Sequence, residues 1–195
     1  MDIQLSEAPL SALAELATVS TAFEVRRTLD VAVQDAGPDR FSLSERRLDV
    51  PYVKNYDAIE GEGPNHWARR FDLSNWGLIL ARAKGRCVGG AVMAFKTPGL
   101  AMLEDRSDLA VLWDIRVAPE LRGQGVGSAL FHAAEAWAAA KGCRQLKVET
   151  QNINLAACRF YARQGCTLGA IDRCAYREFP AEVQLIWYKE LSGKS

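Results

Sequence analysis

A glycine-rich turn between an apolar strand and a helix constrains this chain more than any other feature. Residues 112–117 read Leu-Trp-Asp-Ile-Arg-Val, an apolar, β-branched run that is typical of a buried strand. Pro119 ends the strand, because proline donates no hydrogen bond to a central ladder. The segment Arg122-Gly-Gln-Gly-Val-Gly127 follows, and a helical pattern begins directly after it. Glycines permit a close backbone approach, and the first N–H groups of a helix favour an anion, so the sequence predicts a phosphate-binding turn.

Two other glycine-rich nucleotide motifs do not fit this turn. A dinucleotide-binding turn has the pattern Gly-x-Gly-x-x-Gly, whereas the glycines here alternate at positions 123, 125 and 127. A nucleotide P-loop ends in Gly-Lys-Ser/Thr, and this turn contains no lysine. The remaining pattern, Arg-x-x-Gly-x-Gly, is short, and a tight turn without a ligand would satisfy it equally well. The elements that follow the turn therefore have to distinguish a phosphate-binding turn from a turn without a ligand.

The elements after the turn provide that context. A second strand is predicted over 145–151 and a second helix over 154–165. The order of strand, Arg-x-x-Gly-x-Gly, helix, strand and Asn-x-x-Ala-x-x-Phe-Tyr-x-x-x-Gly resembles the GNAT superfamily of acyl-CoA-dependent N-acyltransferases. Residues 148–154, 157–161 and 185–188 look most like the streptothricin acetyltransferase branch. The resemblance is clear over the C-terminal half of the chain and loose over the N-terminal half.

The order of the expected elements also indicates the fold class. Strands dominate the first half of the chain and two clear helices lie in the second, which is typical of an α+β, or mixed α/β, architecture. The resemblance implies a GNAT-type twisted, mostly antiparallel sheet flanked by helices and splayed between the 112–117 and 145–151 strands. It also implies a single domain over 1–195, with an acceptor-side half over 1–100 and an acetyl-CoA-binding core over 109–191.

The remaining elements follow from hydrophobic periodicity. A short amphipathic helix, or a linker into one, is expected over 5–19, and a strand over 23–33, broken by Gly37-Pro38. Further along, we expect extended chain around Pro51, a loop over 60–64, a short helix over 65–73, a hairpin of strands 76–83 and 87–96, a central strand over 109–117, and closing antiparallel strands over 167–171 and 183–188. The helix after the glycine-rich turn carries one apolar stripe that is expected in the core: Val126, Leu130, Phe131, Ala134, Trp137 and Ala138.

Composition narrows the classes of partner. The chain is 49% hydrophobic and 25% charged with a formal net charge of zero, so bulk attraction to nucleic acid or to an anionic membrane is not expected. Neither a signal peptide nor a membrane-spanning run is recognisable. Five cysteines without a Cys-x-x-Cys pair, beside two histidines, disfavour zinc and are expected to be buried thiols in a reduced, cytoplasmic setting. The expected partner is a small-molecule amine, for a monomer or homodimer.

The resemblance implies acetyl-CoA as co-substrate and suggests its contacts. Backbone amides of residues 122–128 would hold the pyrophosphate, and Arg122 would add a charge-assisted contact. Ile115 and Val117 would offer backbone groups to the pantetheine arm, and Asn154 would cap a helix, contact the cofactor, or do both. No metal site is expected. The expected cofactor-binding residues are Ile115, Arg116, Val117, Arg122, Gly123, Gln124, Gly125, Val126, Gly127, Ser128 and Asn154.

Acyl transfer to an amine needs a neutral amine and a proton for the departing thiolate. The resemblance places Tyr161 as the residue that protonates the CoA thiolate, and a buried aromatic on a helix face is the alternative. Asp114 and Glu149 lie on the two strands expected to splay, where a carboxylate could bind a cationic acceptor or take its proton through water. An ion pair with Arg116 or Lys147 is the alternative for either acid.

Three functions remain open. The favoured one is an acetyl-CoA-dependent N-acetyltransferase for an amine of a small cationic molecule, with a streptothricin-type antibiotic as the sharpest case. The second is a GNAT enzyme for a protein N-terminus, a lysine side chain or a polyamine. The third is a non-catalytic CoA-binding sensor, against which the presence of Tyr161 argues.

Overall fold

The computed structural model describes residues 2–33 and 41–191, in which the chain forms two compact units. The first unit is drawn from 1–22, 55–148 and 189–195, and the second from 23–54 and 149–188. The strands are β1 (Ile3–Ala8), β2 (Phe23–Val33), β3 (Phe41–Lys54), β4 (Gly77–Ala83), β5 (Arg86–Ala94), β6 (Leu109–Val117), β7 (Gln145–Gln151), β8 (Thr167–Asp172) and β9 (Gln184–Glu190). The helices are α1 (Leu13–Leu16), α2 (Trp67–Arg70), α3 (Val126–Ala140) and α4 (Leu155–Arg163), with 3-10 turns over Leu10–Ala12, Tyr56–Ala58, Ala101–Leu103 and Pro119–Leu121.

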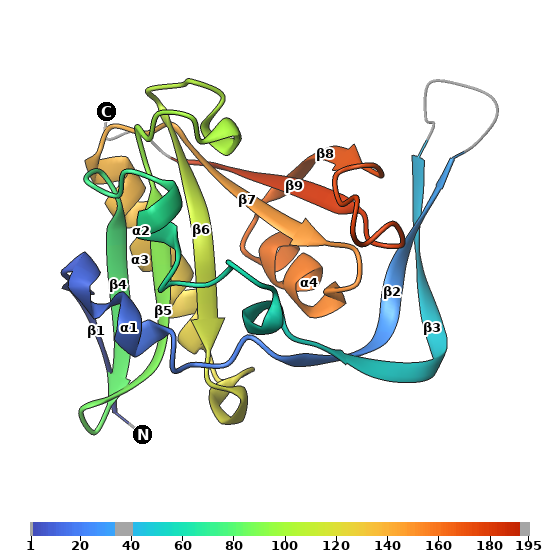
Figure 1. The fold of residues 1–195 in the computed structure, drawn as a ribbon, viewed down its shortest axis with the longest axis horizontal. Helices are drawn as coiled ribbons and strands as arrows, with labels where there is room; N and C mark the ends of the chain where they lie inside the picture. Colours follow the sequence, from blue (N-terminus) through green and yellow to red (C-terminus); the bar gives the residue numbers. More distant parts are fainter. Residues whose placement is uncertain (1, 34–40, 192–195) are drawn as a thin grey trace. The chain divides into compact units, whose positions relative to one another are not determined.

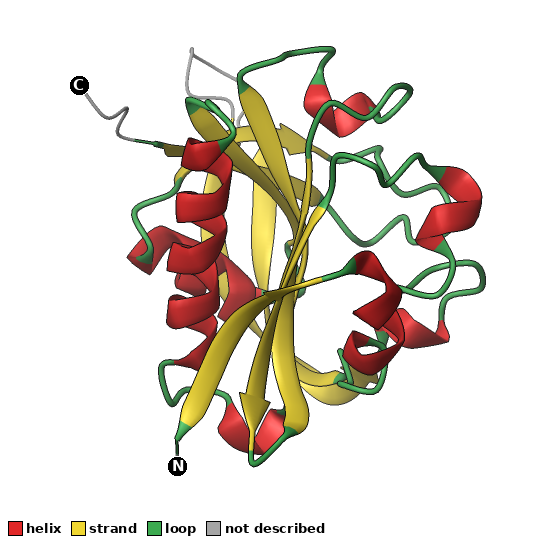
Figure 2. Ribbon diagram, turned by 90° about the vertical axis from the view of Figure 1, so that its left-hand side faces the viewer, coloured by secondary structure: helices red, strands yellow, loops and turns green. Residues whose placement is uncertain are grey.

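Most strands belong to one sheet with the hydrogen-bonded order β1-β4-β5-β6-β7-β9-β8, while β2 and β3 form a separate antiparallel pair (Figure 1). Helices lie beside the sheet, so the fold is the mixed α/β, mostly antiparallel architecture that was predicted (Figure 2). The parallel register of β6 and β7 covers Leu109–Leu112 and Gln145–Val148. β6 continues to Val117 and β7 to Gln151, so this register covers the first part of each strand, and the splay beyond it stays a prediction.

The first unit is built around the antiparallel strands β4, β5 and β6. The long helix α3 covers one face of these strands, and the short helices α1 and α2 lie on the other (Figure 1). Every residue of the predicted apolar stripe of α3 is buried, which confirms its place in the core. Gly77 on β4 allows the Trp137 ring of α3 to pack directly against the strand backbone, because a Cβ at position 77 would lie 2.4 Å from Trp137 Cε2.

The predicted N-terminal helix over 5–19 is wrong for its first residues. Ile3–Ala8 forms β1 and pairs antiparallel with β4, from Ile3 opposite Ala83 to Ala8 opposite Leu78. Pro9 separates this strand from the helical turns, and only Leu13–Leu16 is α-helical. The apolar residues of 10–17 do recur at helical spacing, but the alternation that precedes them serves a strand whose partner lies far along the chain.

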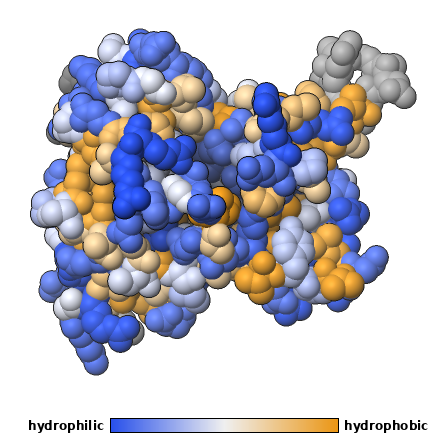
Figure 3. Space-filling model, viewed as in Figure 1, coloured by the Kyte–Doolittle hydropathy of each residue, from blue (hydrophilic) through white to orange (hydrophobic). Residues whose placement is uncertain are grey.

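The second unit combines the β2–β3 ribbon with α4 and the β8–β9 pair. The strand predicted over 23–33 is confirmed, the extended chain around Pro51 is part of β3, and Gly37-Pro38 lies outside the described residues. Apolar side chains remain exposed along the ribbon, as the orange surface near β2 and β3 shows (Figure 3). They are Val33, Phe41, Leu43, Val50, Tyr52 and Val53.

Buried polar contacts hold the interior of this second unit together. The indole N–H of Trp187 on β9 donates to Thr150 Oγ1 on β7 at 2.9 Å. Lys54, at the end of β3, forms a buried ion pair with Glu182.

No helix in the described part of the chain is long and apolar enough to cross a membrane.

Candidate functional site

The glycine-rich turn opens α3 with a backbone that only glycine adopts easily. Gly123 has φ +76° and Gly125, the N-cap of α3, has φ +88°. A Cβ at either glycine would meet no atom within 4 Å, so the conformation, and not packing, requires glycine here. The helix runs for 15 residues behind the turn, and its first N–H groups lie at the positive end of the helix dipole. The turn therefore fits the pyrophosphate of acetyl-CoA, its expected ligand.

Arg122 has a different environment from the one expected. Its Nε donates to Val117 O at 2.9 Å, and its two terminal nitrogens donate to the carbonyls of Ala22 and Ser20, each at 2.8 Å. Burial lowers the pKa of this guanidinium from its ordinary value. Arg122 thus ties the turn to the end of β6 and to the segment after α1, and its charge-assisted contact with phosphate stays a prediction.

Arg116 is the centre of a buried ionic network in the first unit. Its side chain is 3% exposed and binds Asp114 through two nitrogens, with an Nε–Oδ1 distance of 2.9 Å. A terminal nitrogen donates to Asp57 Oδ1 at 2.9 Å and to Val19 O at 3.1 Å. Burial lowers the pKa of the Arg116 guanidinium, but hydrogen bonds and charge from Asp114 and Asp57 outweigh it and raise that pKa overall.

This network contains two of the expected site residues, whose roles toward acceptor and cofactor stay predictions. Asp114 is in the ion pair with Arg116 that was the alternative to a catalytic role, so its carboxylate is compensated. The Arg116 side chain is likewise directed at carboxylates, and only its backbone, paired opposite Gly90 on β5, belongs to the strand expected to meet the cofactor. Two carboxylates around one guanidinium leave the network one negative charge in excess.

Asp57 is a functional candidate that sequence reasoning missed. Its Oδ2 accepts the backbone N–H of Thr21 at 2.9 Å and the hydroxyl of Thr21 at 2.8 Å. Burial raises the pKa of the Asp57 carboxyl, but the Thr21 hydrogen bonds and Arg116 outweigh it and lower that pKa overall. The only local signal was Asn55, whose side chain accepts from the Asp57 N–H at the start of a 3-10 turn. The partners themselves are remote in sequence.

Replacing this carboxylate tests the network. Asp57→Asn is expected to lower the free energy of unfolding by about 1–3 kcal/mol, because it removes charge-assisted hydrogen bonds from a buried guanidinium. A lowered folded pKa stabilises the protein above the unfolded pKa, and this contribution disappears as the pH falls through the folded pKa. Urea unfolding should therefore show a difference from wild type at pH 7 that shrinks toward pH 3. Exposed Glu60 supplies the control Glu60→Gln, and a pH-independent difference would contradict the assignment.

The second unit contains the other candidate residues. Asn154 caps α4, as predicted, by accepting the Ala157 N–H on its Oδ1 at 3.1 Å. Gly165 ends the same helix with φ +76°, and the N–H of Cys166 donates to Tyr161 O at 3.0 Å. Tyr161 lies on the buried face of α4 and is 4% exposed. The cap at Asn154 and the turn at Gly165 thus define both ends of the helix that carries Tyr161.

Lys147 and Glu149, considered from sequence as an ion pair, each have recorded partners within their own unit. Lys147 is buried and donates from Nζ to Glu104 Oε1 at 2.6 Å within the first unit. Glu149 is half-buried and accepts hydrogen bonds from Tyr176 and Gln184 in the second unit. Tyr176 and Gln184 were not anticipated, because no spacing rule connects them to β7.

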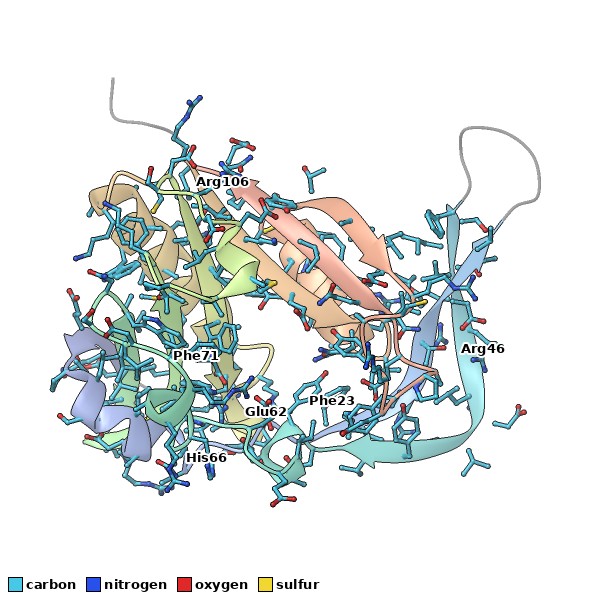
Figure 4. All side chains as sticks on the ribbon, turned by 45° about the horizontal axis from the view of Figure 1, so that its top comes forward. Phe23, Arg46, Glu62, His66, Phe71 and Arg106 are labelled. Atoms are coloured by element: carbon cyan, nitrogen blue, oxygen red, sulfur yellow. The ribbon has the colours of Figure 1, made fainter. Side chains whose placement is uncertain are left out.

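An aromatic cluster covers β6 in the first unit. The ring centroids of Phe71 and Trp113 lie 5.3 Å apart in an edge-to-face arrangement, and Phe71 is directed toward this strand (Figure 4). Trp67 and Trp76 complete the cluster, with 6.1 Å between their ring centroids. Trp67 and Phe71 thus belong to a core that supports the strand carrying Asp114.

The cysteines differ from one another in exposure. Cys143, Cys158 and Cys166 are buried as expected, whereas Cys87 is half-buried and the expectation is wrong for exposed Cys174. Burial raises the pKa of the Cys143 thiol to about 11, which disfavours its thiolate. Among the residues that the structure describes, no group of three or more histidine, cysteine, aspartate or glutamate side chains could hold a metal ion.

Comparisons with known proteins agree on one family. The model of the Acetyltransferase (GNAT) family matches residues 44–166. Streptothricin acetyltransferase A of Bacillus subtilis (strain 168) is 31% identical over 157 residues, which cover 76% of this chain and 79% of the relative. Streptothricin acetyltransferase of Escherichia coli is 28% identical and 90% of each chain is covered.

Solved structures share the fold. A nourseothricin acetyltransferase has a TM-score of 0.76 at 22% identity, covering 98% of this chain and 100% of its own. A protein of Bacillus anthracis str. Ames, solved in complex with acetyl coenzyme A, has a TM-score of 0.75 at 22% identity, covering 97% of this chain and 99% of its own. The chain belongs to the acetyltransferase (GNAT) family and is an N-acetyltransferase that uses acetyl-CoA as its co-substrate.

Proposed function

We propose that this enzyme acetylates an amine of a streptothricin-type antibiotic. The observation that carries the proposal is agreement among relatives over nearly the whole chain. Streptothricin acetyltransferases of Bacillus subtilis, Escherichia coli and Streptomyces lavendulae match 76%, 90% and 89% of its length. Such coverage extends beyond the acetyl-CoA-binding segments into the N-terminal half, where the acceptor-side residues were expected.

A second antibiotic class is the strongest competitor. An aminoglycoside N(6')-acetyltransferase type 1 of Klebsiella aerogenes is 43% identical, but over 97 residues that cover only 50% of this chain. The match is higher in identity and shorter in extent, as expected for a shared cofactor-binding segment with a different acceptor side. A protein N-terminus, a lysine or a polyamine is a further alternative acceptor, and a non-catalytic CoA-binding sensor would acetylate none of these amines.

We assign roles to the residues as part of the same proposal. The backbone of residues 122–128 holds the pyrophosphate, and Tyr161 protonates the departing thiolate. Glu149 attracts the acceptor ammonium and takes its proton, because its carboxylate is half-buried and its hydrogen-bond donors among the described residues are neutral groups. Asp114 is paired with Arg116, so it contributes through the net negative charge of that network.

The acceptor assignment is tested with a panel of amines. Purified enzyme, acetyl-CoA and each amine are mixed, and released thiol is followed; the panel contains streptothricin, an aminoglycoside, free lysine, spermidine and a peptide. We expect streptothricin to give a kcat/KM at least about tenfold above every other amine, and expression in a sensitive bacterium to raise streptothricin tolerance. Turnover of the aminoglycoside or the polyamine without streptothricin would contradict the proposal. Absence of turnover with every amine would favour the sensor.

We further propose that residues 1–195 act as one domain in the cytoplasm. Support for one domain comes from β7 and β9, each of which contributes residues to both compact units. The five free thiols support a reducing compartment.

A further inference from the structure

Three polar side chains of the second unit surround the carboxylate of Glu149. The hydroxyl of Tyr176, from the segment between β8 and β9, donates to Glu149 Oε1 at 2.6 Å. The amide of Gln184, at the start of β9, donates to Glu149 Oε2 at 2.7 Å. Gln151, two residues after Glu149 on the same face of β7, donates to the Tyr176 hydroxyl at 2.9 Å. Each oxygen of the carboxylate therefore has its own donor.

The direction of these hydrogen bonds is determined by the groups themselves. An ionised carboxylate only accepts, so the single proton of Tyr176 is directed at Glu149. The phenolic oxygen then presents lone pairs that accept a hydrogen bond, and the side-chain N–H of Gln151 donates one. The result is a chain of two hydrogen bonds, in which the Gln151 amide polarises the Tyr176 hydroxyl and that hydroxyl polarises the Glu149 carboxylate. Such chains strengthen one another where water is partly excluded, and all four side chains are half-buried.

The geometry also leaves the Glu149 carboxylate able to accept a proton. Two oxygens offer about four acceptor positions, and the two short hydrogen bonds occupy one on each oxygen. A third donor, Gln151 Nε2, lies 3.5 Å from Oε1 and is too distant to compete strongly. No member of this set is a cation, so the negative charge of Glu149 is oriented without being neutralised. This distinguishes Glu149 from Asp114, whose charge Arg116 compensates.

We infer that Tyr176 and Gln184 are positioning residues that hold the Glu149 carboxylate in the orientation that receives a proton from the acceptor ammonium. The inference rests on the proposed function, because it assumes the role given there to Glu149. In the step itself an N–H bond of the ammonium breaks, the proton goes to a Glu149 oxygen directly or through water, and a neutral amine remains. Tyr176 and Gln184 act through Glu149, because each donates a hydrogen bond to one of its oxygens and holds that oxygen in place during the transfer.

A double-mutant cycle tests whether Tyr176 acts through Glu149. Tyr176→Phe keeps the ring and removes the hydroxyl, so kcat with the acceptor should fall about tenfold while the KM for acetyl-CoA stays within about twofold. In the Glu149→Gln background the same change should alter kcat by less than about twofold, because the group it positions is gone. Gln184→Ala should show the same pattern. Tyr52→Phe, which removes a hydroxyl from an exposed tyrosine of β3, is the matched control.

Two results would overturn the inference. One is an equal fold-loss from Tyr176→Phe in the wild-type and Glu149→Gln backgrounds, which would make Tyr176 independent of the carboxylate. The other is wild-type kcat in Tyr176→Phe or in Glu149→Gln. The cycle is run with the fastest amine of the panel, so a negative result with streptothricin would refute the proposed acceptor without affecting this measurement. Thermal melts of each variant separate a loss of rate from a loss of fold.

Discussion

Gly125→Asp is expected to weaken CoA binding by at least about 100-fold while leaving the fold in place. The N-terminus of α3 attracts an anion, and an aspartate at its N-cap would set a second negative charge against the pyrophosphate. The protein itself has room for the side chain, because a Cβ at Gly125 would meet no atom within 4 Å. The positive φ costs about 1–2 kcal/mol for a residue with a side chain, and Asp is among those that tolerate it best.

Gly125→Asn separates charge from shape in this experiment. Asn has nearly the same size as Asp and tolerates the same backbone region, so it should carry the same conformational cost without the repulsion. Titration calorimetry with CoA should show a much smaller loss of affinity for Asn than for Asp, and the difference should shrink as salt is added. Equal affinities of the Asp and Asn variants would show that the turn does not face the pyrophosphate.

The strands and helices that the sequence predicted well are those with a strong local pattern. The strand over 23–33, the central strand over 109–117 and the strand over 145–151 agree with the structure to the residue. In each of them β-branched and apolar residues are bounded by glycine, proline or polar turns. The apolar stripe of α3 was equally clear, because periodicity alone determines which residues of a helix face a sheet.

Predictions failed where a distant partner decides the outcome. Ile3–Ala8 is a strand because β4 lies beside it, and the partners in the pairs Ile3–Ala83 and Ser6–Leu80 are 80 and 74 positions apart in the sequence. The hydrogen bonds of Arg122 to the carbonyls of Ser20 and Ala22 could not be predicted either, because these partners lie about 100 positions earlier in the sequence. Local propensity contains no information about such pairs.

The same limit explains why two similar carboxylates could not be ranked from sequence. Asp114 and Glu149 occupy comparable places on their strands, and each had a basic residue nearby as an alternative partner. In the structure, Asp114 is bound by Arg116 two residues on, whereas Lys147 pairs with Glu104 and leaves Glu149 to neutral donors. A carboxylate held by neutral groups keeps the charge that an acceptor ammonium needs, so Glu149 is the better candidate for proton transfer.

Tyr161→Phe is expected to lower kcat by about 100-fold, the usual effect of losing a general acid. The phenol hydroxyl is a proton donor at neutral pH, and the departing thiolate needs a proton. Phenylalanine keeps the ring, so the edge-to-face contact with Phe160, at 5.1 Å between ring centroids, and the burial of the α4 face should survive. The KM for acetyl-CoA should therefore change by less than about threefold, because the hydroxyl acts in the transition state and not in binding.

Steady-state kinetics with the best amine of the panel, together with a thermal melt, measure both parts of this expectation. Tyr188→Phe, which removes a hydroxyl from a half-buried tyrosine of β9 in the same unit, is the matched control and should keep kcat within about threefold. A Tyr161→Phe variant with wild-type kcat would leave the residue a packing role on α4 and transfer thiolate protonation to water. A loss of rate that appears only with a large fall in melting temperature would likewise count against proton donation, because the hydroxyl would then be stabilising the helix. The expected outcome is a slow enzyme that binds acetyl-CoA and melts as the wild type does.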